Sequence, residues 1–204
     1  MHPNPAFRHA VRAQHLELAR ARGFGTLTVS AEPFPLLSHV PFVMEEEGTV
    51  DLHLVRSNPI SRALAAGPAP AVLAVQGPDG YVSPDWYGDP GQVPTWNYVA
   101  VHLRGRLSLR APETLRPHLE ALSDHFEATL PKTPWKMSKV PEEALAKLER
   151  MILPVRLAIE ETDGTWKLGQ NKPEAMRLGA AGAIEGSHGA ELAELAALMR
   201  DPPA

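Results

Sequence analysis

The stretch Gln76–Gly105 reads QGPDGYVSPDWYGDPGQVPTWNYVAVHLRG, and the interpretation of the whole chain starts from it. It holds all three tyrosines of the protein and two of its four tryptophans. Gly and Pro separate these aromatic residues, which indicates a turn-rich segment. The cluster has two interpretations. It is either a surface that receives a flat ligand or a partner chain, or a loop with a few packing anchors.

Strands are predicted on both sides of this stretch. Val50, Leu52 and Leu54 alternate with Asp51 and His53, and this period of two predicts a strand with one buried face. The predicted strands cover residues 24–31, 35–44, 49–56, 71–76 and 95–110, and the acidic run 45–48 predicts a charged hairpin turn.

The strand 95–110 has one apolar face with a break in it. That face consists of Val99, Val101, Leu103, Leu107 and Leu109. Gly105 predicts a bulge or bend, as barrel strands often need. Further along the chain, Asp163-Gly164 predicts a hairpin between strands 153–162 and 165–169.

Helices are predicted at both ends of the chain and in one insertion. Asn4-Pro5 and Asn58-Pro59 each place a capping Asn before a Pro at the first helical position. The first of these helices continues to Gly23. We expect a domain over residues 1–172 with inserted helices at 112–152, followed by a helical tail over residues 173–204.

Strands dominate the first half of the chain, and no regular helical crossovers join them. This pattern favours a mainly β fold with flanking helices (α+β), built on an antiparallel barrel, over a doubly wound sheet.

Composition narrows the classes of function. The chain has 204 residues, a formal net charge of −4 and no cysteine, which excludes disulfides, thiolate catalysis and cysteine-ligated metal sites. The charge does not favour DNA as a partner, although a local basic patch would still permit it. The longest apolar run, 64–75, is broken by Gly and Pro and is too short to cross a bilayer, so we expect a cytoplasmic protein.

Two groups of residues carry candidate chemistry. Arg56 ends a predicted strand just before the capped helix that follows Asn58, and a guanidinium beside a helix start suits an anion. The alternative is an ordinary capped helix. His118 and His125 lie seven residues apart on one helical face, but no third ligand accompanies them, so we predict no metal site.

The segments, taken in order, resemble the PaiB-like family of FMN-binding negative transcriptional regulators. The similarity runs over most of the chain. The matching segments are Met1–Phe7, His39–Phe42, residues 48–59, Gln76–Tyr87, Val93–Gly105 and Lys167–Lys172. His2 replaces the usual Tyr, Gly169 replaces a Ser, and the tail after Met176 matches nothing recognisable.

The resemblance implies an FMN-binding split β-barrel that forms a homodimer, with the flavin at the subunit interface. FMN needs flat contacts for its ring and cationic or hydrogen-bonding donors for its phosphate. We expect Arg56, Ser57 and Asn58 to contact the phosphate or ribityl chain. The residues expected to line the ring, line the dimer interface or close the site are Ser83, Trp86, Tyr87, Thr95, Trp96, Asn97, Lys167, Gln170, Asn171 and Lys172.

Two functions from different classes follow from this resemblance. One is a flavin-binding regulator, and the other is a flavin-dependent oxidoreductase similar to pyridoxamine-phosphate oxidases or flavin reductases. The fold alone decides neither. No catalytic residue is assigned, because the best acid/base candidates, His53 and His102, have an equally simple interpretation as hydrogen-bonded structural histidines.

Overall fold

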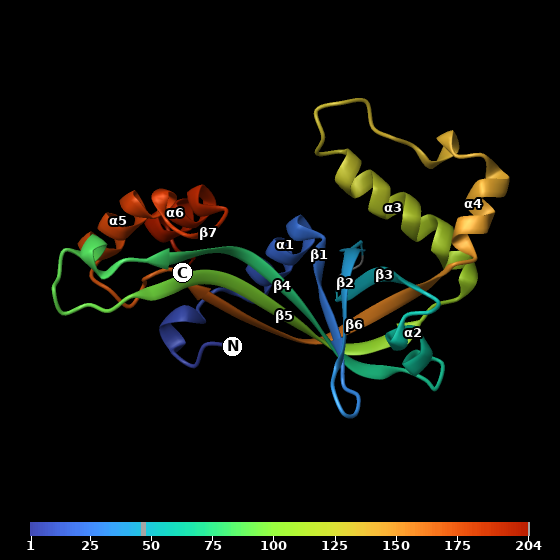
Figure 1. The fold of residues 1–204 in the computed structure, drawn as a ribbon, viewed down its shortest axis with the longest axis horizontal. Helices are drawn as coiled ribbons and strands as arrows, with labels where there is room; N and C mark the ends of the chain where they lie inside the picture. Colours follow the sequence, from blue (N-terminus) through green and yellow to red (C-terminus); the bar gives the residue numbers. More distant parts are fainter. Residues whose placement is uncertain (46–47, 204) are drawn as a thin grey trace. The chain divides into compact units, whose positions relative to one another are not determined.

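The computed structural model describes residues 1–45 and 48–203 (Figure 1). The hairpin turn predicted at Glu45–Gly48 therefore falls partly outside the described residues. The chain forms two compact units that interleave along the sequence. The barrel unit comprises Arg20–Ala74 and Leu103–Glu161, and the terminal unit comprises Met1–Ala19, Val75–His102 and Thr162–Ala204.

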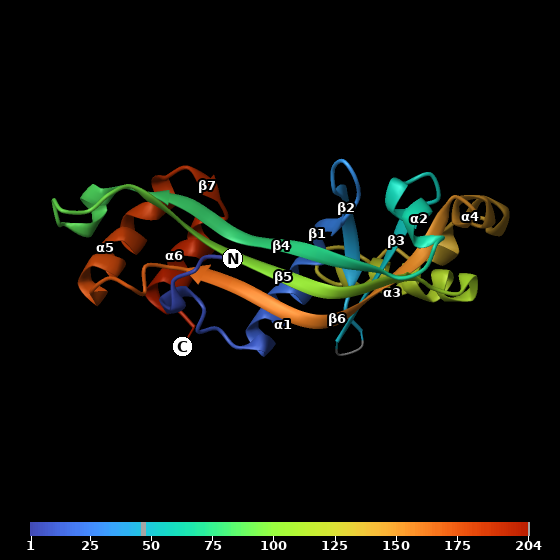
Figure 2. The same cartoon turned by 90° about the horizontal axis from the view of Figure 1, so that it is seen from below.

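The barrel unit contains a closed antiparallel β-barrel, which confirms the predicted fold class. Its strands follow the order β1-β2-β3-β6-β5-β4, and β1 also pairs with β4, so the ring has no free edge. Of these strands, β4, β5 and β6 are long and lie side by side (Figure 2). The bounds are β1 Phe24–Val29, β2 Leu36–Val43, β3 Thr49–Val55, β4 Ala69–Val82, β5 Thr95–Leu109 and β6 Ile152–Lys167.

The core of the barrel comes from alternate positions of its strands. Val50, Leu52 and Leu54 of β3 are at most 2% exposed, as the alternation predicts. On β5, Leu103 and Leu107 are fully buried, but the buried face ends before Leu109. Each buried aliphatic side chain contributes about 1.5–3 kcal/mol, so this core dominates the stability of the unit.

Gly105 is required by the contact between β5 and β6. A Cβ built on Gly105 would lie 1.8 Å from the carbonyl oxygen of Ala158. Any side chain larger than a hydrogen atom at position 105 would therefore collide with the backbone of β6, and only glycine allows the two strands to lie at this separation.

An insertion between β5 and β6, residues 112–151, forms the α3–α4 arm. It consists of η3 (Pro112–Thr114), α3 (Leu115–Glu127), η4 (Met137–Lys139) and α4 (Glu142–Glu149), which confirms the predicted inserted helices. The short helix α2 (Pro59–Leu64) follows β3, and Asn58 caps it as expected.

The hairpin predicted at Asp163-Gly164 is wrong, because β6 runs without a break through both residues. The N-terminal segment holds them in the strand. Arg8 forms an ion pair with the buried Asp163 at 2.8 Å, and the His2 backbone N–H donates to Thr165 at 3.0 Å. The His15 ring lies where a Cβ of Gly164 would stand. An Asp-Gly pair thus serves tertiary packing here rather than a turn.

Two further boundaries differ from expectation. Strand β4 continues to Val82 instead of ending at Gln76, because Asp79 and Gly80 pair with the short strand β7 (Gly189–Ala190). The first predicted helix is divided into η1 (Pro5–Phe7) and α1 (Arg12–Arg22). The Val11 N–H donates to the Gln14 side chain, which begins α1 anew.

The tail lies in the terminal unit and is helical, as predicted. It forms α5 (Glu174–Ala183), η5 (Ile184–Gly186) and α6 (Leu192–Arg200). Helix α5 packs against η2 (Pro84–Tyr87). Arg177 of α5 donates to the carbonyl oxygens of Met199 and Arg200 and so caps the end of α6.

The division of the sequence into residues 1–172 and 173–204 stays a prediction. Within residues 1–45 and 48–203, no helix combines the length and the apolarity needed to cross a bilayer.

The contact at Gly105 gives a direct test of the barrel. We expect Gly105→Ala to lower the free energy of unfolding by about 3 kcal/mol or more, since the new methyl group meets a backbone atom that cannot rotate away. Urea denaturation followed by circular dichroism measures this. The matched control is Gly182→Ala in α5, where nothing lies within 4 Å, and a gain of about 0.5–1 kcal/mol is expected. Equal changes in the free energy of unfolding for the two variants would contradict the close contact between Gly105 and the Ala158 carbonyl.

Candidate functional site

The predicted site residues fall into two clusters. The phosphate cluster, Arg56, Ser57 and Asn58, lies in the barrel unit, where β3 ends and α2 begins. The ring cluster lies in the terminal unit and consists of Ser83, Trp86, Tyr87, Thr95, Trp96, Asn97, Lys167, Gln170, Asn171 and Lys172.

The phosphate cluster is shaped by local hydrogen bonds. The Asn58 side chain accepts from the Ile60 N–H at 2.9 Å and donates to the Ser38 hydroxyl at 3.1 Å, so its amide is fully engaged in capping. Helix α2 is only six residues long, and its dipole adds little. Arg56 and Ser57 are exposed. They are therefore the donors that remain available to an anion.

Arg56 is fixed by the last turn of the α3–α4 arm. Its backbone N–H donates to the Met151 carbonyl at 2.9 Å, and its side-chain Nε donates to the Arg150 carbonyl at 2.6 Å. Beside it lies a cavity of about 520 Å³, which is lined by Arg56 and, from the arm, by Arg116, Glu149 and Arg150. This volume is typical of a small-molecule site.

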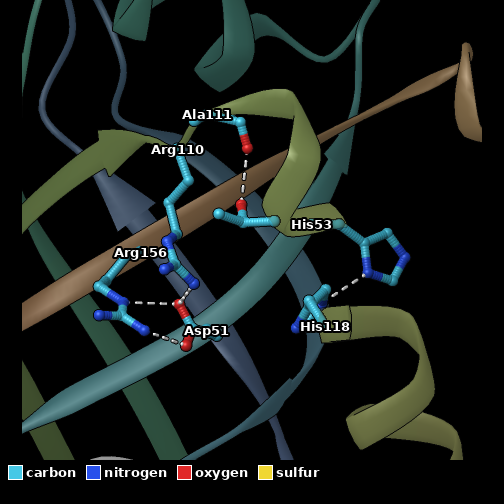
Figure 3. A network of polar contacts seen from close by, with 7 residues as sticks. Asp51, His53, Arg110, Ala111, His118 and Arg156 are labelled. Carbon is cyan, nitrogen blue, oxygen red and sulfur yellow. Dashed lines mark hydrogen bonds and ion pairs between the residues drawn. The ribbon is translucent and has the colours of Figure 1, made fainter. Parts of the chain in front are cut away.

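The outward face of β3 carries a polar network (Figure 3). The buried Asp51 carboxylate receives two hydrogen bonds from Arg156, at 2.6 and 2.7 Å, and one from Arg110 at 3.2 Å. Such charge-assisted pairs are stronger than neutral ones. The network ties β3 to β6 and to the end of β5.

Two residues further along the same face, His53 meets His118 of α3. Nδ1 of His53 and Nε2 of His118 are 3.1 Å apart, so one ring donates and the other accepts (Figure 3). Burial lowers the pKa of His53, and burial followed by the charge of His53 lowers the pKa of His118 to about 4. Both rings are therefore neutral near pH 7, and the hydrogen bond between them agrees with the structural interpretation of His53, which stays a prediction.

In the ring cluster, two lysines link separate segments of the terminal unit. Lys167 at the end of β6 donates to the Thr95 hydroxyl at the start of β5, and Lys172 donates to the Gln92 side chain. The Lys172 ammonium also lies 5.3 Å from the centroid of the Tyr87 ring. Burial and the charge of Lys172 lower the pKa of Lys167. The two ammonium groups thus form one positive region.

Two members of the ring cluster serve the backbone or the core. Gln170 accepts from the Leu168 N–H at 2.8 Å and donates to the Trp166 carbonyl, which stabilises the turn after β6. Asn97 is 1% exposed and lies 3.4 Å from the Met199 sulfur. Gly169 in the same turn has φ of +86°, a conformation that glycine adopts readily and serine does not.

The exposed members of the ring cluster leave a surface open to a flat ligand. Trp96 is 46% exposed, and its ring meets that of Tyr81 edge to face at 6.5 Å. Asn171 is exposed, while Ser83 and Trp86 are half-buried. By contrast, Tyr87 is 5% exposed and acts as a packing anchor, which supports the second of the two interpretations for that residue.

Comparison with known proteins identifies the family. The family described as "Putative FMN-binding domain" matches residues 1–161. The chain belongs to this family. FMN is accordingly its cofactor. A curated member, protease synthase and sporulation protein PAI 2 of Bacillus subtilis, is 26% identical over 181 residues and covers 87% of this chain and 86% of its own length. An uncharacterized protein of Aspergillus fumigatus is 28% identical, with coverage of 80% and 81%.

Solved structures confirm the flavin-binding split-barrel fold. The FAD and heme binding protein of Mycobacterium smegmatis is similar with a TM-score of 0.57 and 22% identity, over 77% of this chain and 71% of that one. A conserved hypothetical protein of Mycobacterium tuberculosis gives a TM-score of 0.58 and 14% identity, over 82% and 92%. At these identities the likeness establishes the fold and not the activity.

Several contacts of the candidate site could not be predicted from the sequence. Gln92 holds Lys172, and the backbone carbonyl of Arg150 holds Arg56. A carbonyl has no signature in the sequence, because every residue carries one. His118 contacts His53 instead of acting with His125, which packs against Phe126. Among the described residues, no group of three or more His, Asp or Glu side chains could hold a metal.

The His53–His118 contact predicts an acid-sensitive barrel unit. Because the folded-state pKa of His118 is about 4, against an ordinary 6.5, the unfolded chain binds more protons between these values. Stability is therefore complete above about pH 6.5 and declines as the pH falls toward 4, by on the order of 3 kcal/mol. Urea denaturation between pH 8 and 4 measures the decline, and His118→Gln is expected to flatten it. A variant curve parallel to that of the wild type would contradict the assignment.

Proposed function

We propose that this chain is an FMN-binding regulator of the PaiB-like type that holds its flavin at a homodimer interface. The observation that carries the proposal is the family match over residues 1–161, which places the chain among FMN-binding domains. The regulatory role comes from the resemblance to the PaiB-like family, and the similarity to the protease synthase and sporulation protein PAI 2 extends over most of both chains.

Each cluster, taken by itself, offers chemistry that one part of FMN needs. The phosphate needs cationic donors, and Arg56 offers a fixed guanidinium beside a cavity. The isoalloxazine ring needs a flat partner and polar donors, and the ring cluster offers the exposed Trp96 and the ammonium groups of Lys167 and Lys172. When bound, the flavin would supply one- and two-electron redox chemistry or a redox-dependent signal.

A dimer is supported by apolar side chains on the surface of the ring cluster and its loop. Val93 is 72% exposed and lies three residues before Trp96. Aromatic and aliphatic groups exposed together are typical of protein interfaces. A second subunit would cover them.

A flavin-dependent oxidoreductase is the second candidate, and one observation is compatible with it. The positive region formed by Lys167 and Lys172 would stabilise negative charge on a reduced flavin. A regulator that senses the flavin's redox state would benefit from the same charge, so the two functions share this feature.

Removal of one ammonium from the ring cluster tests its contact with the flavin. We expect Lys172→Ala to weaken FMN binding about tenfold, because a charge-assisted contact is lost. Quenching of flavin fluorescence on titration with apoprotein measures the dissociation constant. The matched control is Lys147→Ala, an exposed lysine of α4, which should bind FMN as the wild type does. If Lys172→Ala also binds FMN like the wild type, the ring cluster does not contact the flavin.

The regulator and the oxidoreductase differ in what the FMN-loaded protein does. A regulator shifts a specific promoter fragment in a gel at 150 mM salt and leaves an unrelated fragment unshifted. An oxidoreductase loses its flavin absorbance when NADH or NADPH is added without oxygen. We expect the specific gel shift, and rapid bleaching without any shift would instead favour the oxidoreductase.

A further inference from the structure

Arg56 joins the end of β3 to the end of the α3–α4 arm at two points. The backbone N–H and the side-chain Nε of Arg56 donate to the consecutive carbonyls of Met151 and Arg150, at 2.9 and 2.6 Å. An arginine bonded through Nε cannot swing freely. Within the described residues, its two terminal nitrogens have no protein partner, so this edge of the guanidinium is available to a ligand.

The arginines that line the neighbouring cavity differ in whether a carboxylate already pairs with them. Arg116 lies between Glu142 and Glu149, at 2.7 and 2.9 Å, and its charge is neutralised by these two carboxylates. Arg150, which also lines the cavity, has no such carboxylate partner within the described residues. Arg56 and Arg150 are thus the two cations that the cavity offers.

The remaining wall of the cavity is partly apolar. Leu115, Ile152 and Leu153 line it, together with the exposed carboxylate of Glu113. Two guanidinium groups suit a dianion better than a single carboxylate does, since each can donate a pair of parallel hydrogen bonds to a phosphate. A volume of about 520 Å³ accommodates a phosphate together with part of a polyol chain.

We infer that the α3–α4 arm supplies the second half of the FMN phosphate subsite, with Arg150 as its second cationic ligand. This inference rests on the proposed FMN-binding function. Arg150 acts through two different groups. Its carbonyl orients Arg56, and its guanidinium contacts the phosphate.

The position of the arm is set by the outward face of β3, and Arg56 follows directly after the end of this strand. His53 holds His118 of α3, and Asp51 holds Arg110 just before η3. Two contacts therefore fix the start of the arm to β3, and Arg56 fixes its end. The arm selects for a phosphorylated flavin because it carries one of the two cations.

The test compares FMN with riboflavin, which has the same ring and ribityl chain but no phosphate. The full-length apoprotein is titrated with each flavin, and binding is followed by fluorescence quenching. We expect Arg150→Gln to weaken FMN binding about tenfold and Arg56→Gln at least as much, with riboflavin binding changed less than twofold. Because Arg150→Gln keeps the backbone carbonyl, the anchor of Arg56 stays in place.

The matched control is Arg106→Gln, an exposed arginine of β5 in the same unit that does not line the cavity. It should leave both affinities unchanged. Three outcomes overturn the inference: FMN binding unaffected by Arg150→Gln, an equal loss for FMN and riboflavin, or an equal loss in the Arg106 control. If the wild-type protein binds neither flavin, the proposed function itself fails, and the inference with it.

Discussion

The Asp51 carboxylate, held by Arg156 and Arg110, is the interaction on which the outer side of the barrel unit depends. It is 4% exposed, so removal of both arginines would leave an uncompensated buried charge, at a cost of about 3–5 kcal/mol. The same interaction joins β3 to β6 and to the end of β5. Because the α3–α4 arm begins just after Arg110, this network also sets where the arm leaves the barrel.

From Asp51 the polar contacts continue along β3 to the phosphate cluster. His53 is two residues on and Arg56 is five, and each contacts the arm. The inward residues of the same strand, Val50, Leu52 and Leu54, form the core. The side chains of β3 alternate between its two faces, and the two faces therefore have different roles. Its inner face stabilises the barrel and its outer face positions the arm, while Arg56 follows directly after its end.

The sequence predicts those features that depend on local chemistry. The alternation of β3 and the cap at Asn58 follow from the residue types in their immediate neighbourhood. Gly105 predicted a bulge or bend, whereas the structure shows a close approach to Ala158 of β6 there. The sequence does not predict contacts between distant positions, such as His53 with His118, 65 residues apart. The wrong hairpin at Asp163-Gly164 has the same origin, because Arg8, 155 residues away, holds Asp163 in the strand. For the candidate site, the family resemblance predicts the residues of both clusters, but local pattern could not show that Gln170 and Asn97 serve the turn and the core.

A crystal structure of the protein with FMN tests most directly where the cofactor's phosphate binds. The account predicts density for the phosphate within hydrogen-bonding distance of the Arg56 guanidinium, with Arg150 on a second oxygen. A phosphate bound instead by Lys167 and Lys172, with Arg56 contacting no ligand, would contradict the account.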